Sequence, residues 1–594
     1  LLSARAVPYE PKPAFRRDIA MLAFCSVIAV IILSMIGMAQ YAALIKFWPY
    51  NLELTLDNYD FDLANGGGWG SYFNSIRMSV YTAVIGTVVI FFGAYLLEKG
   101  RGFTVGRNVF HAVAMLPLAV PAYAIAYTYG GLLEYSGPVQ STLRIWFGWS
   151  RGDYWFPEIR SVGGAAVVLA FVLYPYVYML ARAAFLEQSV CVIEIGRTLG
   201  RSPWRGFTSI ALPLARPAIV TGISLALMET LSDFGAVQLM RYDTLTRAIE
   251  SNYLARPPMA FALSLILLVF AGAVVAAERS VSRRLPEVKV HRAQQTASYA
   301  LGRWRTPAML LVGGTFAFSI VAPSVALIDW AADGLLRNQR GGRPLTIDSS
   351  KVFEAATNTL SSSILTGFVA LIAVVPIAFL AGRYRDRIGH FSHSVVIATF
   401  AVPGILIALS LRFWTLRSGF FGDLLYDTLA LLIFAYVVRF AALAMGTALV
   451  AVKTVPEHLH DAAATLGADR WRRFRTVDLP LMRPGLLAAS GLVVLSTMKE
   501  LPISLIIAPI GFPTLTTRIF GSFEDAFVAE AGIMALVLVC ASGFLSWILV
   551  LRRADRGGVL PHNSRAAVVV GSRSPGVVGG PPRPRSALPR QGRP

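Results

Sequence analysis

The chain has 594 residues, of which 55% are apolar and only 15% are charged, and its mean hydropathy is +0.59. Soluble domains carry about 25% charged residues, so a soluble enzyme, a disordered protein and a nucleic-acid-binding domain fit poorly. The 54 Lys and Arg exceed the 34 Asp and Glu, which gives a net charge of +20. Because these basic residues gather in alternate loops, as in membrane proteins, the composition predicts an all-α polytopic membrane protein.

Twelve apolar runs are long enough to cross a bilayer, which requires about 20 residues of helix. The first run has no persuasive A-x-A cleavage site, so we expect a retained helix and not a signal peptide. The loop at 49–73 holds four acidic residues and no Lys or Arg, whereas the loops on the opposite side are basic, which predicts two cytoplasmic termini. The predicted spans lie at about 19–45, 76–97, 108–133, 162–185, 214–240, 258–278, 307–332, 358–381, 392–415, 425–452, 481–508 and 527–551.

The two halves of the chain repeat each other. Four pairs of segments recur in the same order, two of them at offsets of 267 and 270 residues, which chance similarity between apolar helices would not produce. The repeat predicts two parallel six-helix units, 19–278 and 307–551, with a pathway between them. A cytoplasmic N-terminus at 1–18, a cytoplasmic linker at 279–306 and a disordered basic cytoplasmic tail at 552–594 complete the predicted domains. The matching segments are Asn74-Ser-Ile and Asn358-Thr-Leu, Ala119-Val-Pro121 and Ala401-Val-Pro403, Gly200…Leu212-Pro213 and Gly467…Leu479-Pro480, and Met228…Leu231…Thr246 and Met498…Leu501…Thr516.

The loop between the fourth and fifth spans has the same spacing in both halves. An acidic residue is followed six residues later by a glycine, and a Leu-Pro pair begins the next span. Glycine permits the left-handed conformation that ends a helix, so we expect short cytoplasmic helices at 188–199 and 456–466. Their small side chains favour docking of a partner over an ordinary amphipathic loop on the membrane surface. The residues expected to couple to that partner are Glu194, Gly200, Leu212, Pro213, Asp461, Ala462, Ala463, Gly467, Leu479 and Pro480.

This loop resembles the EAA motif of ATP-binding cassette (ABC) importer permeases, in which it forms the coupling helix that docks in a cleft of the ATP-binding subunit. The first copy departs from the motif at the small pair, which is Ile195-Gly196, and the second has Asp461 in place of Glu. Neither departure changes the spacing. The resemblance implies two copies of an ATP-binding subunit, which bind ATP and Mg, while this chain binds no cofactor.

The fused form resembles the permease of the bacterial ferric iron importers over about residues 15–551. This resemblance implies import of ferric iron through the inner membrane, delivered by an extracytoplasmic ferric-iron-binding protein. Membrane lipid is the other expected contact, and no nucleic acid is expected. The matching segments are Leu116-Pro-Leu-Ala-Val-Pro-Ala-Tyr123, Met228-Glu-Thr-Leu-Ser-Asp-Phe-Gly-Ala-Val237, Ala401-Val-Pro-Gly404 and Met498-Lys-Glu-Leu-Pro502.

Ionisable residues inside predicted spans are costly and usually face a cavity or a partner. Glu229 and Asp233 are four residues apart in the fifth span, so they share a helical face. The eleventh span holds Lys499 and Glu500, and the offset of 270 pairs Lys499 with Glu229. These groups predict a partly acidic pathway, to which Tyr123, Tyr127 and Tyr129 add hydroxyls. A structural ion pair between Glu229 and Lys499, and direct coordination of ferric iron by oxygen ligands, are the alternatives, and no metal site is assigned.

One other class of transporter, and other cargoes for an importer, remain as alternatives. Gly382-Arg-Tyr-Arg-Asp-Arg-Ile-Gly389 fits the G-x-x-x-D-R-x-G signature of major facilitator transporters, although the equivalent loop of the first half lacks the Asp-Arg pair. Importers of thiamine or polyamines are the alternatives for the cargo. The chain has no Gly-x-x-x-x-Gly-Lys-Ser/Thr phosphate loop and no Gly-x-Ser-x-Gly elbow, so it is expected to be a transport subunit and not an enzyme.

Overall fold

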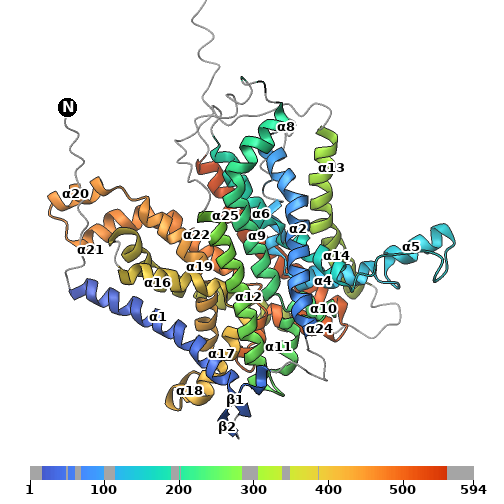
Figure 1. Ribbon diagram of the computed structural model, residues 1–594, viewed down its shortest axis with the longest axis horizontal. Coiled ribbons are helices and arrows are strands. Elements are labelled where there is room, and N and C mark those ends of the chain that lie inside the picture. The colour runs from blue at the N-terminus through green and yellow to red at the C-terminus, as the bar shows by residue number, and fades with distance from the viewer. Residues whose placement is uncertain are drawn as a thin grey trace, which may run out of the picture. The chain divides into compact units, whose positions relative to one another are not determined.

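The structure is a computed structural model, which describes residues 16–47, 51–59, 69–99, 111, 114–188, 198, 200, 202–283, 305–336, 348–384 and 387–557. The chain through Leu549 forms one compact unit, and Val550–Pro594 forms a second. The first unit is a bundle of helices with a single two-stranded ribbon among the described residues (Figure 1). Most of the predicted linker at 279–306 and of the predicted tail at 552–594 lies outside the described residues.

The first half begins with a long apolar helix followed by a short antiparallel ribbon, which the sequence did not predict. The ribbon pairs Ile45 with Leu54 and Phe47 with Asn51. The elements are α1 (Arg16–Ala43), β1 (Ile45–Phe47), β2 (Asn51–Leu54), η1 (Asp57–Tyr59), α2 (Trp69–Lys99), η2 (Leu116–Ala119), α4 (Ala122–Leu133), α5 (Pro138–Phe147), α6 (Val162–Glu187), α8 (Pro203–Gly206), η3 (Phe207–Ala211), α9 (Leu212–Ser232), α10 (Gly235–Leu239), α11 (Leu245–Asn252) and α12 (Pro257–Arg283).

The second half follows the same order of long and short helices. Its elements are α13 (Arg305–Phe316), η5 (Ala317–Val321), α14 (Ala322–Leu336), α15 (Ser349–Phe379), η7 (Leu380–Tyr384), α16 (Arg387–Ala398), η8 (Thr399–Ala401), α17 (Gly404–Arg417), α18 (Phe420–Leu425), α19 (Leu429–Lys453), α20 (Glu457–Thr465), α21 (Arg470–Arg473), η9 (Phe474–Asp478), α22 (Leu479–Thr497), α23 (Pro502–Ile507), α24 (Leu515–Glu524) and α25 (Val528–Gly557).

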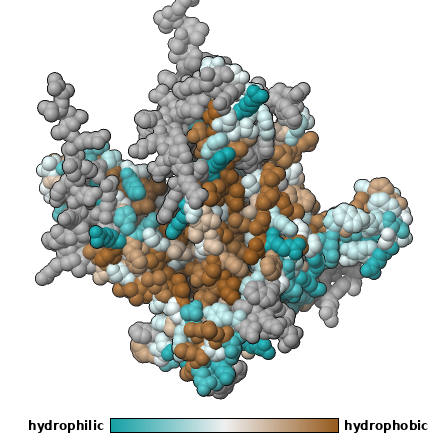
Figure 2. Space-filling view, in the orientation of Figure 1, coloured by the Kyte–Doolittle hydropathy of each residue, from teal (hydrophilic) through white to brown (hydrophobic). Residues whose placement is uncertain are grey.

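Nine helices among the described residues are long and apolar enough to cross a membrane, or ten if the bent pair α16–α17 is one span. They correspond to ten of the twelve predicted spans. The remaining two predictions fall on α2, which has 31 residues, and on the segment that contains η2 and α4. Figure 2 shows apolar side chains over the helices of the bundle and a mixture of hydrophilic and apolar ones at the end that carries the ribbon, as expected where a surface that faces lipid gives way to an aqueous end.

Proline breaks two of the predicted spans, and in these places the prediction of one continuous helix is wrong. Within 108–133, α4 starts after Pro121, and within 392–415, α17 starts after Pro403. The second break bends the span by 109°. Proline lacks an N–H donor and disfavours the helical conformation of the residue before it, and Val120 and Val402 are accordingly extended.

Two more predicted spans, one in each half, are broken in their C-terminal parts. Within 214–240, α9 ends at Ser232 and α10 begins at Gly235, and Asp233 between them is extended. Within 481–508, α22 ends at Thr497 and α23 begins at Pro502. Each half therefore contains two broken spans at corresponding positions, and the breaks expose backbone groups that need partners inside the membrane.

Corresponding hydrogen bonds confirm the internal repeat. Asn74 Nδ2 donates to the carbonyl of Asp243, and Asn358 Nδ2 donates to the carbonyl of Pro513, both at 3.0 Å. In the next position of each motif a hydroxyl accepts a backbone N–H, so that each span is tied to the loop after the broken helix. These second bonds run from Leu245 N to Ser75 Oγ (2.9 Å) and from Leu515 N to Thr359 Oγ1 (2.8 Å).

Replacing Asn358 by alanine is expected to lower the free energy of unfolding by about 1 kcal/mol, because the Pro513 carbonyl loses its donor. Asn74→Ala should have a similar effect. Thr357→Ala is the matched control, since this hydroxyl bonds only within its own helix, to Phe353 and Glu354. Thermal unfolding in detergent measures the difference, and equal midpoints for all three variants would contradict the structural role of the repeat motif.

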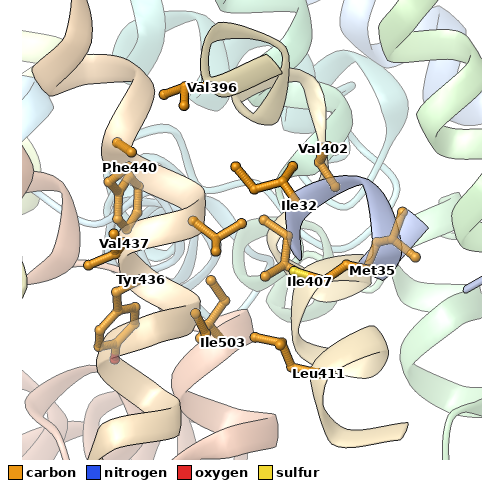
Figure 3. Packing of buried hydrophobic residues seen from close by; sticks show 14 of the residues in the cluster. Ile32, Met35, Val396, Val402, Ile407, Leu411, Tyr436, Val437, Phe440 and Ile503 are labelled. Atoms are coloured by element: carbon orange, nitrogen blue, oxygen red, sulfur yellow. The ribbon is translucent and has the colours of Figure 1, made fainter. Parts of the chain in front are cut away.

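The first helix of each half packs against the other half. Helix α1 contacts α16 and α17, while α13 contacts α2 and α14 contacts α4. Figure 3 shows Ile32 and Met35 of α1 among side chains of α17, α19 and α23, including Ile407 and Ile503. In contrast, α2, α6 and α9 pack together within the first half, as α15, α19 and α22 do in the second. The halves are therefore interlocked through their first helices.

Candidate functional site

The four helix breaks meet at one cavity of about 90 Å³. One water needs roughly 10–15 Å³ of such space, so the cavity has room for several waters. Its lining comes from both halves: the breaks before α4, α10, α17 and α23, together with α6 and α19. The polar side chains that line it are Tyr123, Tyr176, Glu229, Ser232, Asp233, Arg439, Ser496, Lys499 and Glu500.

Two carboxylates of the cavity cap the short helices that follow the breaks. Asp233 Oδ1 accepts the backbone N–H of Ala236 at 2.9 Å, and Glu500 Oε1 accepts that of Ile503 at 3.3 Å. In both cases the acceptor lies three residues before the donor, so Asp233 corresponds to Glu500. Gly404 lies against Glu500, because a Cβ there would be 2.8 Å from Oε1.

This correspondence changes one predicted alignment. At the breaks, corresponding residues of the two halves are 267 positions apart. This offset becomes 270 only beyond α23, where the second half has three more residues before α24. The predicted equivalence of Glu229 and Lys499 is therefore wrong. Asp233 is the residue that caps the end of α9, and it lines the same cavity as Glu229.

Two cations supply donors to the carbonyls that the breaks release. Lys499 Nζ donates to the carbonyl of Leu118 at 2.8 Å. Arg439 Nη1 donates to the carbonyl of Phe400 at 3.2 Å and also to that of Val402. Leu118 and Phe400 each lie three residues before the proline of a break, so their carbonyls correspond. One accepts a hydrogen bond from a lysine and the other from an arginine. A carbonyl without a partner in the membrane costs several kcal/mol, and these contacts offset that cost.

Glu229 joins the two halves through Arg439. Its Oε2 lies 3.9 Å from Nη2 of Arg439, whose side chain is only 6% exposed, compared with 30% for Glu229. The structure thus shows Glu229 paired with Arg439 and not, as in the structural alternative, with Lys499. Arg439 Nε is buried without a hydrogen-bond partner, so the guanidinium retains a donor toward its surroundings.

Of the three predicted tyrosines, one reaches the cavity. Tyr123 is buried, and its hydroxyl has no hydrogen-bond partner. Tyr127 instead stacks on Phe523 with ring centroids 4.1 Å apart, and Tyr129 donates to the carbonyl of Phe318. These two tyrosines therefore do not line this cavity.

Sequence reasoning missed Arg439 and Tyr176, which line the same cavity. Arg439 could have been found, because it is an arginine within the predicted span 425–452, and charges within spans usually face a cavity or a partner. Tyr176 carried no comparable signal, since it brings no charge into the predicted span 162–185.

The loop of the second half contains the short helix that its spacing predicts, α20. Gly467 ends it with φ +75°, and Gly200 has the same φ in the first half. Gly467 N donates to Ala464 O and Ala468 N donates to Ala463 O, both at 3.0 Å, which is the left-handed helix end expected from glycine. Asp461 and Ala462 are exposed and Ala463 is half-buried, so this face of α20 is open to a partner. Glu194 and most of the first predicted helix lie outside the described residues.

Both loops continue into the next span through an aromatic pair and a π turn. The rings of Trp204 and Phe207 are 5.7 Å apart, as are those of Trp471 and Phe474. The π turns η3 and η9 then lead into α9 and α22, which begin with the Leu212-Pro213 and Leu479-Pro480 pairs. The wider turn accommodates a proline that has no N–H to donate.

Among the described residues, no group of three or more His, Cys, Asp or Glu side chains has the arrangement of a metal site. The carboxylates of the cavity are instead engaged with backbone N–H groups and with Arg439. The cavity is therefore polar, and its three carboxylates already have partners within the protein.

Comparison with known proteins identifies the architecture. The family model "binding-protein-dependent transport system inner membrane component" matches residues 78–286 and 374–555, one match in each half. The Fe(3+)-transport system permease protein FbpB 2 of Haemophilus influenzae is 27% identical over 77% of this chain and 85% of its own length. A putative ferric transport system permease protein of the same organism is 23% identical over 70% of this chain and 66% of its own length.

Other relatives match a smaller share of the chain. The molybdenum transport system permease protein ModB of Haemophilus influenzae is 29% identical over 27% of this chain and 67% of its own length. The double family match excludes the major facilitator alternative, and it confirms the predicted two-unit permease. The chain belongs to the binding-protein-dependent transport system inner membrane components, as a fused permease subunit of an ABC importer that works with an ATP-binding subunit and a binding protein.

Proposed function

We propose that this chain is the permease of an ABC importer for ferric iron, which a binding protein delivers from the extracytoplasmic side. Two ATP-binding subunits engage α20 and its counterpart in the first half, and they bind ATP and Mg, whereas this chain binds no cofactor. Both termini are cytoplasmic, and the units 19–278 and 307–551 move relative to each other. The proposal is supported by the similarity to two ferric permeases across both halves.

The cavity at the helix breaks supplies the observation that carries the proposal. Three carboxylates and Tyr123 line it, the Tyr123 hydroxyl is buried without a hydrogen-bond partner, and the two cations are engaged with backbone carbonyls. Oxygen groups suit hard cations, and loosely arranged ones permit release. We place the path of the cargo here, between the halves.

The ion pair of Glu229 and Arg439 connects the halves and is expected to respond to their motion. Closure of the ATPase pair pushes the coupling helices, the units rock, and the cavity opens alternately to the two sides. A ligand shifts this equilibrium only if it favours one state. The loaded binding protein therefore has to favour the state in which the cavity is open to it.

Replacing Tyr123 by phenylalanine tests the path directly. The hydroxyl makes no hydrogen bond, so its removal should leave the thermal midpoint unchanged or slightly raised. If the hydroxyl contacts the passing cargo, the uptake rate should fall several-fold. Tyr129→Phe is the control, since that hydroxyl points to Phe318 instead. Normal uptake by Tyr123→Phe would show that the Tyr123 hydroxyl does not contact the cargo.

Uptake into proteoliposomes decides the cargo. The chain is reconstituted with its ATP-binding subunit, and radiolabelled ferric iron is offered on its binding protein with ATP inside. The proposal expects ATP-dependent accumulation of iron that thiamine, polyamines, molybdate and sulfate do not reduce. Accumulation of one of these solutes in place of iron would agree with the assignment as a permease but contradict ferric iron as its cargo.

A further inference from the structure

The connection between α4 and α6, residues 134–161, forms a projection that we call the α5 arm. It contains α5 and the loop after it, and it extends sideways from α4 and α14, transverse to α2 and α13 (Figure 1). The corresponding connection in the second half, 418–428, is much shorter and holds only α18. The arm is thus a feature of the first half that the repeat does not require.

The start of the arm is fixed by a tight turn. A Cβ on Gly137 would lie 2.5 Å from the carbonyl of Gly131, so only glycine fits where the chain leaves α4. Pro138 then begins α5, and Gly148 with φ +66° ends it. The arm therefore leaves the bundle in a defined direction.

Several polar groups of the arm form hydrogen bonds within it. Buried Gln140 donates to Leu133 O at 2.8 Å and accepts from the Tyr154 hydroxyl at 2.7 Å. Arg144 donates to Tyr135 O at 2.8 Å and lies 4.0 Å from the centroid of the Tyr135 ring. At the base of the arm Arg160 is paired with Glu134. These polar groups are thus satisfied within the arm, while Arg151, Asp153 and Glu158 are exposed.

Several large apolar groups of the arm face outward. Ile145 is 80% exposed, Trp146 75% and Trp155 85%. Stacking of Trp149 between Phe147 and Tyr154, at 4.5 and 5.2 Å, keeps the aromatic side chains ordered. Apolar surface costs about 25 cal/mol per Å² in water, and contiguous exposed patches mark sites of interaction.

The chemistry of this face suits a lipid interface better than a protein. The arm holds three arginines and three acidic residues, so it presents no net charge to complement a partner. Tryptophan and tyrosine concentrate where the membrane meets water, and interfacial helices bury one apolar face there. Figure 2 shows the arm paler than the brown bundle, which fits the interface rather than the hydrocarbon layer.

The arm is also continuous with the surface that faces lipid. Helix α14 packs on α4 where the arm begins. It belongs to a membrane-spanning helix and exposes Val325, Ile328 and Leu335. We propose that the α5 arm lies in the membrane–water interface, with the face of Ile145, Trp146 and Trp155 among the lipid headgroups and upper acyl chains.

Spin-label accessibility in nanodiscs tests this proposal without any transport measurement. The full chain, with Cys25, Cys191 and Cys540 replaced by serine, receives a single label through Ile145→Cys, Trp146→Cys or Trp155→Cys. Asp57→Cys is the control, since it lies exposed at the start of η1, after the β ribbon. Collision rates are measured with oxygen, which partitions into lipid, and with a water-soluble nickel chelate.

The three arm positions should show an oxygen-to-nickel ratio several-fold higher than Asp57→Cys, with or without a binding protein. A ratio equal to that of the control would overturn the proposal. Protection from nickel that appears only when the loaded binding protein is added would also overturn it, and would assign the face to protein docking instead.

Discussion

Replacing Arg439 by leucine is expected to abolish transport and to lower the free energy of unfolding by about 3 kcal/mol. The variant leaves the carbonyls of Phe400 and Val402 without their donor and Glu229 without its partner. Removing one member of a buried pair costs about 3–5 kcal/mol, and the partial exposure of Glu229 places the expectation at the lower end. Uptake rate and thermal midpoint in detergent measure the two effects.

A second variant separates the roles of Arg439. In Arg439→Leu combined with Glu229→Gln, the unpaired carboxylate is gone, so part of the lost stability should return while transport stays low. Arg417→Leu is the matched control, because this arginine lies over Phe413 and Tyr41 away from the cavity, a contact worth about 0.5–1 kcal/mol. Wild-type uptake and midpoint in Arg439→Leu would contradict the assignment of the cavity.

Replacing Gly467 by proline is expected to reduce ATPase stimulation at least tenfold while the protein still reaches the membrane. Gly467 has φ +75° and donates to Ala464, whereas proline fixes φ near −65° and has no N–H. The end of α20 cannot form, so the exposed face that carries Asp461 and Ala462 is no longer presented. ATP hydrolysis with the loaded binding protein measures the loss.

Two controls accompany this variant. Gly467→Asn should remain near wild type, because asparagine tolerates the left-handed conformation. Gly419→Pro places the same strain at another positive-φ glycine, in the connection between α17 and α19, and should leave stimulation intact. If the loaded binding protein stimulates ATP hydrolysis as strongly with Gly467→Pro as with Gly419→Pro, α20 does not couple the permease to the ATP-binding subunit.

Sequence periodicity located the long helices because an apolar run of sufficient length has few other outcomes in a membrane. It did not locate the breaks, although Pro121 and Pro403 were visible, because prolines are tolerated within many spans when neighbouring groups satisfy the backbone. Here those neighbours are Lys499 and Arg439, which come from distant segments. Only the tertiary structure shows that pairing.

The sequence alone revealed the repeat, because its motif residues have corresponding structural roles in the two halves. Asn74 and Asn358, for example, make corresponding hydrogen bonds. The candidate site was predicted less completely, since the sequence did not show that α9 ends at Ser232 and that Asp233 caps the short helix that follows. The choice of Arg439 as the partner of Glu229 depends on packing between halves, which a single sequence does not encode locally.

ATP hydrolysis in proteoliposomes that hold this chain and its ATP-binding subunit tests the central claim most directly. The binding protein is added with and without ferric iron. The account predicts stimulation by the iron-loaded protein alone, and its loss in Gly467→Pro. Equal hydrolysis with loaded and empty binding protein, or no association of the chain with an ATP-binding subunit, would contradict it.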